Sequence, residues 1–255
     1  MVRPAAVAGM FYDDDPQKLK AFVDQALADA NKGDPQRDEP SRAHGPQSVV
    51  PKAIIVPHAG YVYSGKVAAK GYALLQAHPP KQITLVGPSH SYPFDGSVTS
   101  AQIWETPLGT VKMHPCQGLD IRERAFEEEH SLEVQLPFLL TVAPKARITP
   151  ILYCNETPEH LASHLDNDSF IIVSSDLSHF HSYDAAKKRD KASIDSMLSL
   201  DVKGAIDACG DTGIKALLLL AKKNGWKPKF IEYKNSGDTS GDKSRVVGYA
   251  TIAFY

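Results

Sequence analysis

Five short, continuous apolar segments stand out along the chain, and each has the length of a β-strand. They are AIIVP at residues 53–57, ITLVG at 83–87, ARITPILY at 146–153, SFIIVSS at 169–175 and VVGYATIAFY at 246–255. Runs that are apolar at nearly every position are typical of strands covered on both faces. The pattern therefore predicts a buried sheet that contains these five segments.

Between these runs, apolar residues recur at helical spacing. The expected helices cover residues 13–30, 65–77, 130–142, 158–165, 182–200, 201–208 and 212–224. Strands that alternate with helices indicate an α/β protein with a parallel sheet. We therefore expect a single domain over residues 1–255, a sandwich in which helices flank a central, mostly parallel sheet. Residues 31–48 are rich in Pro, Gly and charge, and we expect them to form an exposed loop inserted before the core.

Composition excludes several classes of protein. The 255 residues include 28 Lys+Arg and 30 Asp+Glu, for a net charge of −2, which lacks the basic footprint of a nucleic-acid binder. Three cysteines are too few for a disulfide framework and indicate a reducing compartment. No apolar stretch approaches the ~20 residues of a membrane span, and the first residues lack the apolar core of a signal peptide. We therefore expect a cytoplasmic, globular protein with no nucleic-acid or membrane partner.

Histidines follow three of the expected strands. His58 follows the first run, His90 the second and His179 the fourth. Because ligand sites in open α/β sheets form at the carboxyl ends of strands, we expect these loops to meet. Asp176 precedes His179 by three residues, where its carboxylate could fix the imidazole tautomer. Imidazoles combined with a carboxylate or thiolate hold Zn²⁺ and non-haem Fe²⁺, so the placement predicts a shared metal site.

Two further features leave alternatives open. His130 and Glu133 lie three residues apart at the start of an expected helix, where they could line the site or form an acidic first helical turn. Each of Cys116, Cys154 and Cys209 could be buried and inert. Cys209 differs from the others because an expected helix begins just after it, which would favour the thiolate.

Several motifs occur in a recognisable order. They are RPAAVAGMFY, PHAGYVYSG, GPSH, TPLG, EHSLEVQLPF, SSDLSHF, ACG, and SGDTSGD followed by VVGYA. In this order the chain resembles the Memo family (named for mediator of cell motility), whose microbial members include the AmmeMemoRadiSam system protein B. The resemblance extends from residue 3 to residue 255. It implies the fold of the class III extradiol dioxygenases, which are non-haem iron(II) enzymes with an α/β sandwich.

The resemblance also implies a metal-ligand set. His58 in PHAG and His90 in GPSH match the two histidine ligands of the dioxygenases. Cys209 in ACG takes the position of their glutamate ligand, as is usual in the Memo family. A thiolate is softer than a carboxylate, so it favours Cu(I), Zn²⁺ or an iron site of altered potential, and O₂ can oxidise it.

The remaining site residues receive roles from the same resemblance. His179 in SSDLSH matches the acid/base histidine, and Asp176 and His130 belong to the family's pocket. The catalytic residues expected are therefore His179, Asp176 and His130, with His179 oriented by Asp176 as the general acid/base.

The expected function is redox or dioxygenase-like chemistry on an unidentified substrate at a non-haem metal. Iron(II) is the first expectation for that metal, with copper or zinc as the alternatives. The second hypothesis is a non-catalytic binding module whose histidine-lined cleft captures a phosphorylated or carboxylate small molecule or peptide. The resemblance further implies a pathway link to a radical-SAM protein.

Overall fold

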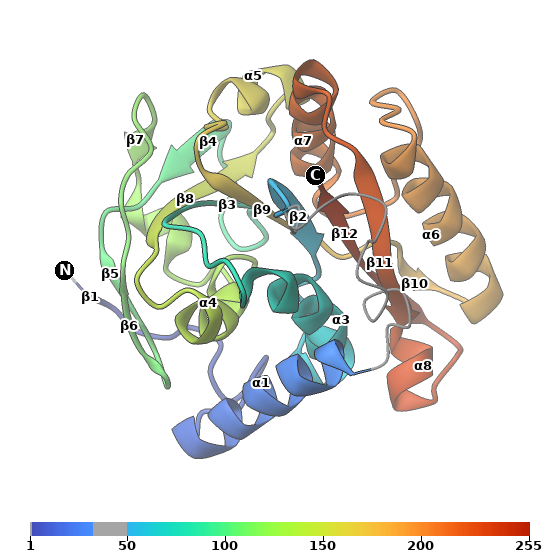
Figure 1. The fold of residues 1–255 in the computed structure, drawn as a ribbon, viewed down its shortest axis with the longest axis horizontal. Coiled ribbons are helices and arrows are strands. Elements are labelled where there is room, and N and C mark those ends of the chain that lie inside the picture. The colour runs from blue at the N-terminus through green and yellow to red at the C-terminus, as the bar shows by residue number, and fades with distance from the viewer. Residues whose placement is uncertain (1, 33–49) are drawn as a thin grey trace.

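The computed structural model describes residues 2–32 and 50–255, and within them a nine-stranded sheet forms the centre of the molecule (Figure 1). Its middle consists of four parallel strands in the order β2 (Ala53–Val56), β9 (Phe170–Ser174), β3 (Gln82–Pro88) and β8 (Arg147–Cys154). These strands correspond to four of the five apolar runs. Their residues are mostly buried because helices cover both faces of the sheet.

Antiparallel strands complete the sheet on both sides. The fifth apolar run forms β12 (Val246–Phe254), which pairs with β2, with β10 (His179–His181) and with β11 (Pro228–Asn235). At the opposite end, β4 (Gly96–Thr99) pairs with β8, and β7 (Asp120–Ile121) pairs with β4. A separate small sheet joins β1 (Val2–Arg3), β5 (Ile103–Thr106) and β6 (Gly109–Lys112). The expected parallel centre is confirmed, whereas most of the shorter strands around it were not predicted.

Helices form a layer on each face of the sheet (Figure 1). One layer contains α1 (Pro16–Asn31), α3 (Tyr61–Tyr72) and α4 (Leu136–Val142), and the other contains α5 (Pro158–Ser163), α6 (Tyr183–Leu198) and α7 (Asp211–Asn224). Shorter elements are α8 (Ser236–Ser240) and the 3₁₀ turns Ala73–Leu75, Glu123–Phe126 and Glu133–Gln135. Each layer packs into its own apolar cluster, so the α/β sandwich is confirmed. In the part of the chain described, no helix is long and apolar enough to cross a membrane.

Three segments differ from the expected elements or lie partly outside the described residues. The helix expected over 130–142 begins only with the 3₁₀ turn at Glu133, so His130 lies in the irregular segment before it. The helix expected over 201–208 is wrong: the Asp201 side chain accepts a hydrogen bond from the Lys203 N–H at 3.1 Å, a local turn that competes with helix formation. The loop expected over 31–48 lies outside the described residues from residue 33 onward.

A buried ion pair attaches the N-terminal segment to the rest of the protein. Arg3 Nη1 lies 2.5 Å from Glu133 Oε2, and both side chains are almost fully buried. The same carboxylate accepts hydrogen bonds from the Ala6 and Val7 N–H groups and from the Tyr12 hydroxyl. Glu133 therefore binds a segment about 130 residues earlier in the chain, a contact that no local sequence pattern indicates.

Replacing Glu133 by Gln should strongly destabilise the protein, because the Arg3 charge would remain buried without its partner. We expect the free energy of unfolding to fall by about 3–5 kcal/mol. The matched control is Asp24→Asn, which removes an exposed carboxylate that pairs with Lys20 on α1. This control should change stability by less than about 0.5 kcal/mol. Urea unfolding of both variants measures the loss in free energy of unfolding. Equal losses would contradict the view that Glu133 balances the buried charge of Arg3.

Candidate metal centre

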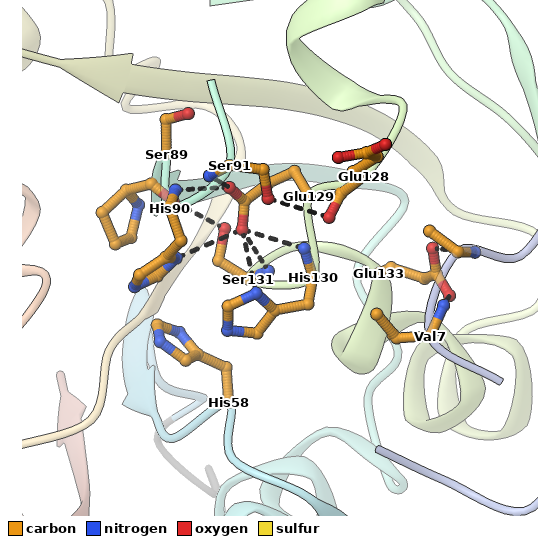
Figure 2. A network of polar contacts seen from close by, with 12 residues as sticks. Val7, His58, Ser89, His90, Ser91, Glu128, Glu129, His130, Ser131 and Glu133 are labelled. Atoms are coloured by element: carbon orange, nitrogen blue, oxygen red, sulfur yellow. Dashed lines mark hydrogen bonds and ion pairs between the residues drawn. The ribbon is translucent and has the colours of Figure 1, made fainter. Parts of the chain in front are cut away.

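Three histidines converge at the carboxyl ends of the parallel strands. His58 follows β2 and His90 follows β3, and these two strands flank β9 in the sheet. His130 reaches the same place from the segment before the 3₁₀ turn at Glu133. Their potential ligand atoms all lie within 4.8 Å of one another, and Figure 2 shows the three rings gathered around one point. The structure therefore confirms the expected meeting of His58 and His90 and adds His130 to the cluster.

The hydrogen bonds around His58 determine which ring nitrogen is free. Ser174 Oγ donates its only hydrogen to the Ser131 carbonyl oxygen at 2.5 Å and accepts a hydrogen bond from Gln135 Nε2 at 2.8 Å. His58 Nδ1 lies 3.0 Å from the same hydroxyl oxygen. Because that oxygen can now only accept, His58 Nδ1 must carry the hydrogen. His58 Nε2 therefore carries the lone pair that could bind an ion.

A buried carboxylate holds the other two histidines. Glu129 accepts hydrogen bonds from the N–H groups of His90, Ser91, His130 and Ser131 and from the His90 ring at Nδ1 (Figure 2). Burial opposes ionisation of Glu129, but these bonds outweigh it and lower its pKa to about 2. His90 therefore donates through Nδ1 and leaves Nε2 free, as in the carboxylate–histidine pairs of metal proteins.

Burial keeps two of the rings uncharged at neutral pH. Burial and the neighbouring rings of His90 and His130 hold the pKa of His58 well below its usual value. Burial lowers the pKa of His130 to about 4, and its ring packs 4.6 Å from the ring of Phe11. The His58 residue is only 2% exposed, whereas the side chains of His90 and His130 are 31% and 18% exposed. His58 and His130 thus offer neutral imidazoles, and the cluster opens to solvent on the side of His90 and His130.

Cys209 lies beside this cluster and contacts only one of its members closely. Its Sγ is 3.2 Å from His58 Nε2, but Cys209 is not part of the three-histidine group. Burial, reinforced by Asp176, raises the pKa of the Cys209 thiol to about 12. Burial therefore outweighs the help that the N-terminus of the following helix was expected to give the thiolate.

Asp176 and His179 lie close to the cluster, and each makes hydrogen bonds with the main chain. The Asp176 carboxylate accepts hydrogen bonds from the N–H groups of His58 at 2.8 Å and Ala59 at 3.3 Å, and burial raises its pKa to about 7. The His179 ring donates a hydrogen bond to the Leu177 carbonyl oxygen, and burial lowers the pKa of His179. In the structure the Asp176 carboxylate therefore positions the main chain at His58, and the expected orientation of His179 by Asp176 stays a prediction.

Three residues of the site were missed by sequence reasoning: Glu129, Ser174 and Gln135. The signal for Glu129 was its position directly before a histidine in the run EEEH, and the signal for Ser174 was its place at the end of an apolar run. Gln135 carries no local signal. Its role depends on the Tyr72 hydroxyl, which donates to its side-chain oxygen and so turns the amide nitrogen toward Ser174.

The donor set fits a transition metal ion. Imidazole nitrogens bind Zn²⁺, copper and Fe²⁺, and a thiol can join them as a thiolate. Two ligands at the usual bond lengths of a tetrahedral ion lie roughly 3.5 Å apart, which is close to the 3.2 Å between Cys209 Sγ and His58 Nε2. The His58, His90 and His130 cluster could therefore bind a metal with small movements of the rings.

Known proteins resemble the chain along its whole length. A sequence model described as "Memo-like protein" matches residues 3–253. The chain is 36% identical to a MEMO1 family protein of Sulfolobus acidocaldarius, with 100% of this chain and 99% of the relative covered. It is 35% identical to MEMO1 family proteins of Metallosphaera sedula and Saccharolobus solfataricus, with the same coverage. The match spans the strands, the histidine loops and the cysteine, and the chain therefore belongs to the Memo family.

Proposed function

We propose that the protein is a metal-dependent oxidoreductase with dioxygenase-like chemistry, whose non-haem metal is held by His58, His90 and His130. The observation that carries this proposal is the convergence of three imidazoles at the end of the sheet, two of them kept neutral by burial. Iron(II) is the first candidate for the metal, and copper and zinc are the others, because imidazole binds all three. Cys209 is the candidate for a further ligand through its contact with His58.

The side chains around the cluster have separable tasks in this proposal. A bound ion would supply Lewis-acid or redox chemistry. Because burial lowers the pKa of His179, this residue is uncharged at neutral pH and can accept a proton as a general base. Asp176 holds the His58 main chain in place. The exposed edges of His90 and His130 leave one side of the centre open for a small-molecule or peptide substrate.

The charges of the site favour a cation over an anion. In the absence of a metal, His58 and His130 are neutral, while Glu129, which lies against His90 and His130, is a buried carboxylate. A phosphate or carboxylate ligand would therefore meet a negative charge rather than a positive one. This argues against the binding module that would capture such anions without a metal.

The three cysteines are free thiols, which supports a location in the reducing cytoplasm.

Replacing either His58 or His90 by Ala should abolish stoichiometric metal binding, because each variant removes one of the three imidazoles. The matched control is His160→Ala, which removes a histidine that pairs with Glu156 on the surface. The measurement is metal analysis of protein purified without air or chelators. We expect one equivalent of iron, copper or zinc in the wild type and in the control. A folded wild type without transition metal would contradict the proposal.

Replacing Cys209 by Ser should remove thiolate coordination while the protein stays folded. In Co²⁺-loaded wild type we expect the near-ultraviolet charge-transfer band of a cobalt–thiolate bond, and we expect its loss in the variant. Affinity for Zn²⁺ and Cu(I) should fall more than affinity for Fe²⁺, because the softer ions prefer sulfur. Cys116→Ser is the control and should keep the band, since Cys116 bonds to carbonyl oxygens of residues 117 and 164. If the Cys209 variant keeps the band, Cys209 is not a ligand.

A further inference from the structure

Glu129 is an unusual feature of the site because it is a fully buried carboxylate with five N–H donors. Its exposure is 0%, and its oxygens accept from four main-chain N–H groups and from the His90 ring. A protonated carboxyl group would place its own hydrogen against these donors, so the arrangement fits the anion. In the described part of the chain, the ion-pair partners of Glu129 are His90 and His130, and neither Lys nor Arg contributes.

A buried charge of this kind requires compensation. Desolvation disfavours an ionised carboxylate, so buried carboxylates are normally hydrogen-bonded and paired with cations or metals. Glu133, only four residues away, has Arg3 as its partner. Glu129 lacks such a partner among the described residues but lies directly behind two of the three clustered histidines. Five N–H donors already stabilise the anion, and a divalent ion bound in front of those rings would add a positive charge that it attracts.

The same carboxylate also joins the two loops that carry these rings. One loop follows β3 and contains His90, and the other contains His130. The second loop packs closely on the sheet, since Ser131 Oγ donates to the Pro88 carbonyl and a Cβ at Gly87 would lie only 2.8 Å from Leu132. Glu129 Oε1 lies 3.2 Å from His90 Nδ1 and 3.4 Å from His130 Nδ1. The first contact is a hydrogen bond, which favours a hydrogen on His90 Nδ1 and a free Nε2, whereas Glu129 holds His130 through its main-chain N–H.

We propose that Glu129 is a positioning residue of the metal centre: it orients the His90 ring with Nε2 toward the ion, fixes the main chain that carries His130, and supplies a negative charge that attracts a divalent cation. This inference rests on the proposed function, because it needs the metal site to exist. A positioning residue differs from a merely structural one in one measurable respect. A residue that only connects two loops affects stability, whereas a positioning residue also affects metal affinity and the ring tautomer in protein that is still folded.

The test is the variant Glu129→Gln, titrated with Co²⁺ and Zn²⁺ in competition with a chromophoric chelator. Glutamine keeps the size of the side chain but removes the charge and one acceptor oxygen. We expect affinity for both ions to fall about 10–100-fold, as for other residues that orient histidine ligands. The matched control is Glu156→Gln, which breaks a carboxylate–imidazole pair with His160, a histidine outside the three-histidine cluster. The control should bind both ions as the wild type does.

A second measurement does not depend on the variant's folding. In the metal-free wild type, ¹⁵N chemical shifts of the imidazoles should show His90 with its hydrogen on Nδ1, and a hydrogen on Nε2 would overturn the inference. If wild-type protein binds neither ion, the proposed function itself fails. If the wild type binds and a folded Glu129→Gln variant binds equally well, only the role of Glu129 fails.

Discussion

The buried carboxylate of Glu129 is the interaction on which the geometry of the site depends. Two of the clustered histidines, His58 and His90, are delivered by strands of the same sheet, but His130 comes from an irregular segment. Fixing such a segment costs about 1–2 kcal/mol of backbone entropy per residue. The Glu129 side chain offsets that cost by accepting hydrogen bonds from the main chain of the loop after β3. The guanidinium of Arg3 also donates to the Glu129 carbonyl oxygen at 2.9 Å.

The sheet and the first two histidines were predictable because their signals are local. A run that is apolar at nearly every position indicates a covered strand wherever it occurs, and a histidine just after such a strand lies at the carboxyl edge by geometry alone. The place of His130 could not be worked out in this way. Its segment is held by Arg3 and by the main chain at His90, which are about 130 and 40 residues distant in sequence. No periodicity marks partners that are so remote.

Cys209 illustrates how burial can override a local rule. The chain before α7 looks like a place where a thiolate would form, because a helix terminus favours negative charge by about 0.3–1 kcal/mol. In the folded protein the same thiol is enclosed, and burial raises its pKa to about 12. Sequence shows which helix follows a cysteine but does not show how much of the sulfur remains in water. Burial also explains the raised pKa of Asp176. It reaches about 7 although two main-chain N–H groups donate hydrogen bonds to the carboxylate.

The pairing of β2 with β12 has a consequence for biosynthesis. The strand that delivers His58 lies between β9 and the last strand of the chain, Val246–Phe254. During translation, His58 and His90 emerge long before this neighbour exists, and Cys209 also precedes it. Pairing between such remote segments is slow and comes late in folding. A nascent chain therefore displays its histidines without the enclosed arrangement, and the donor cluster forms only once synthesis has passed β12.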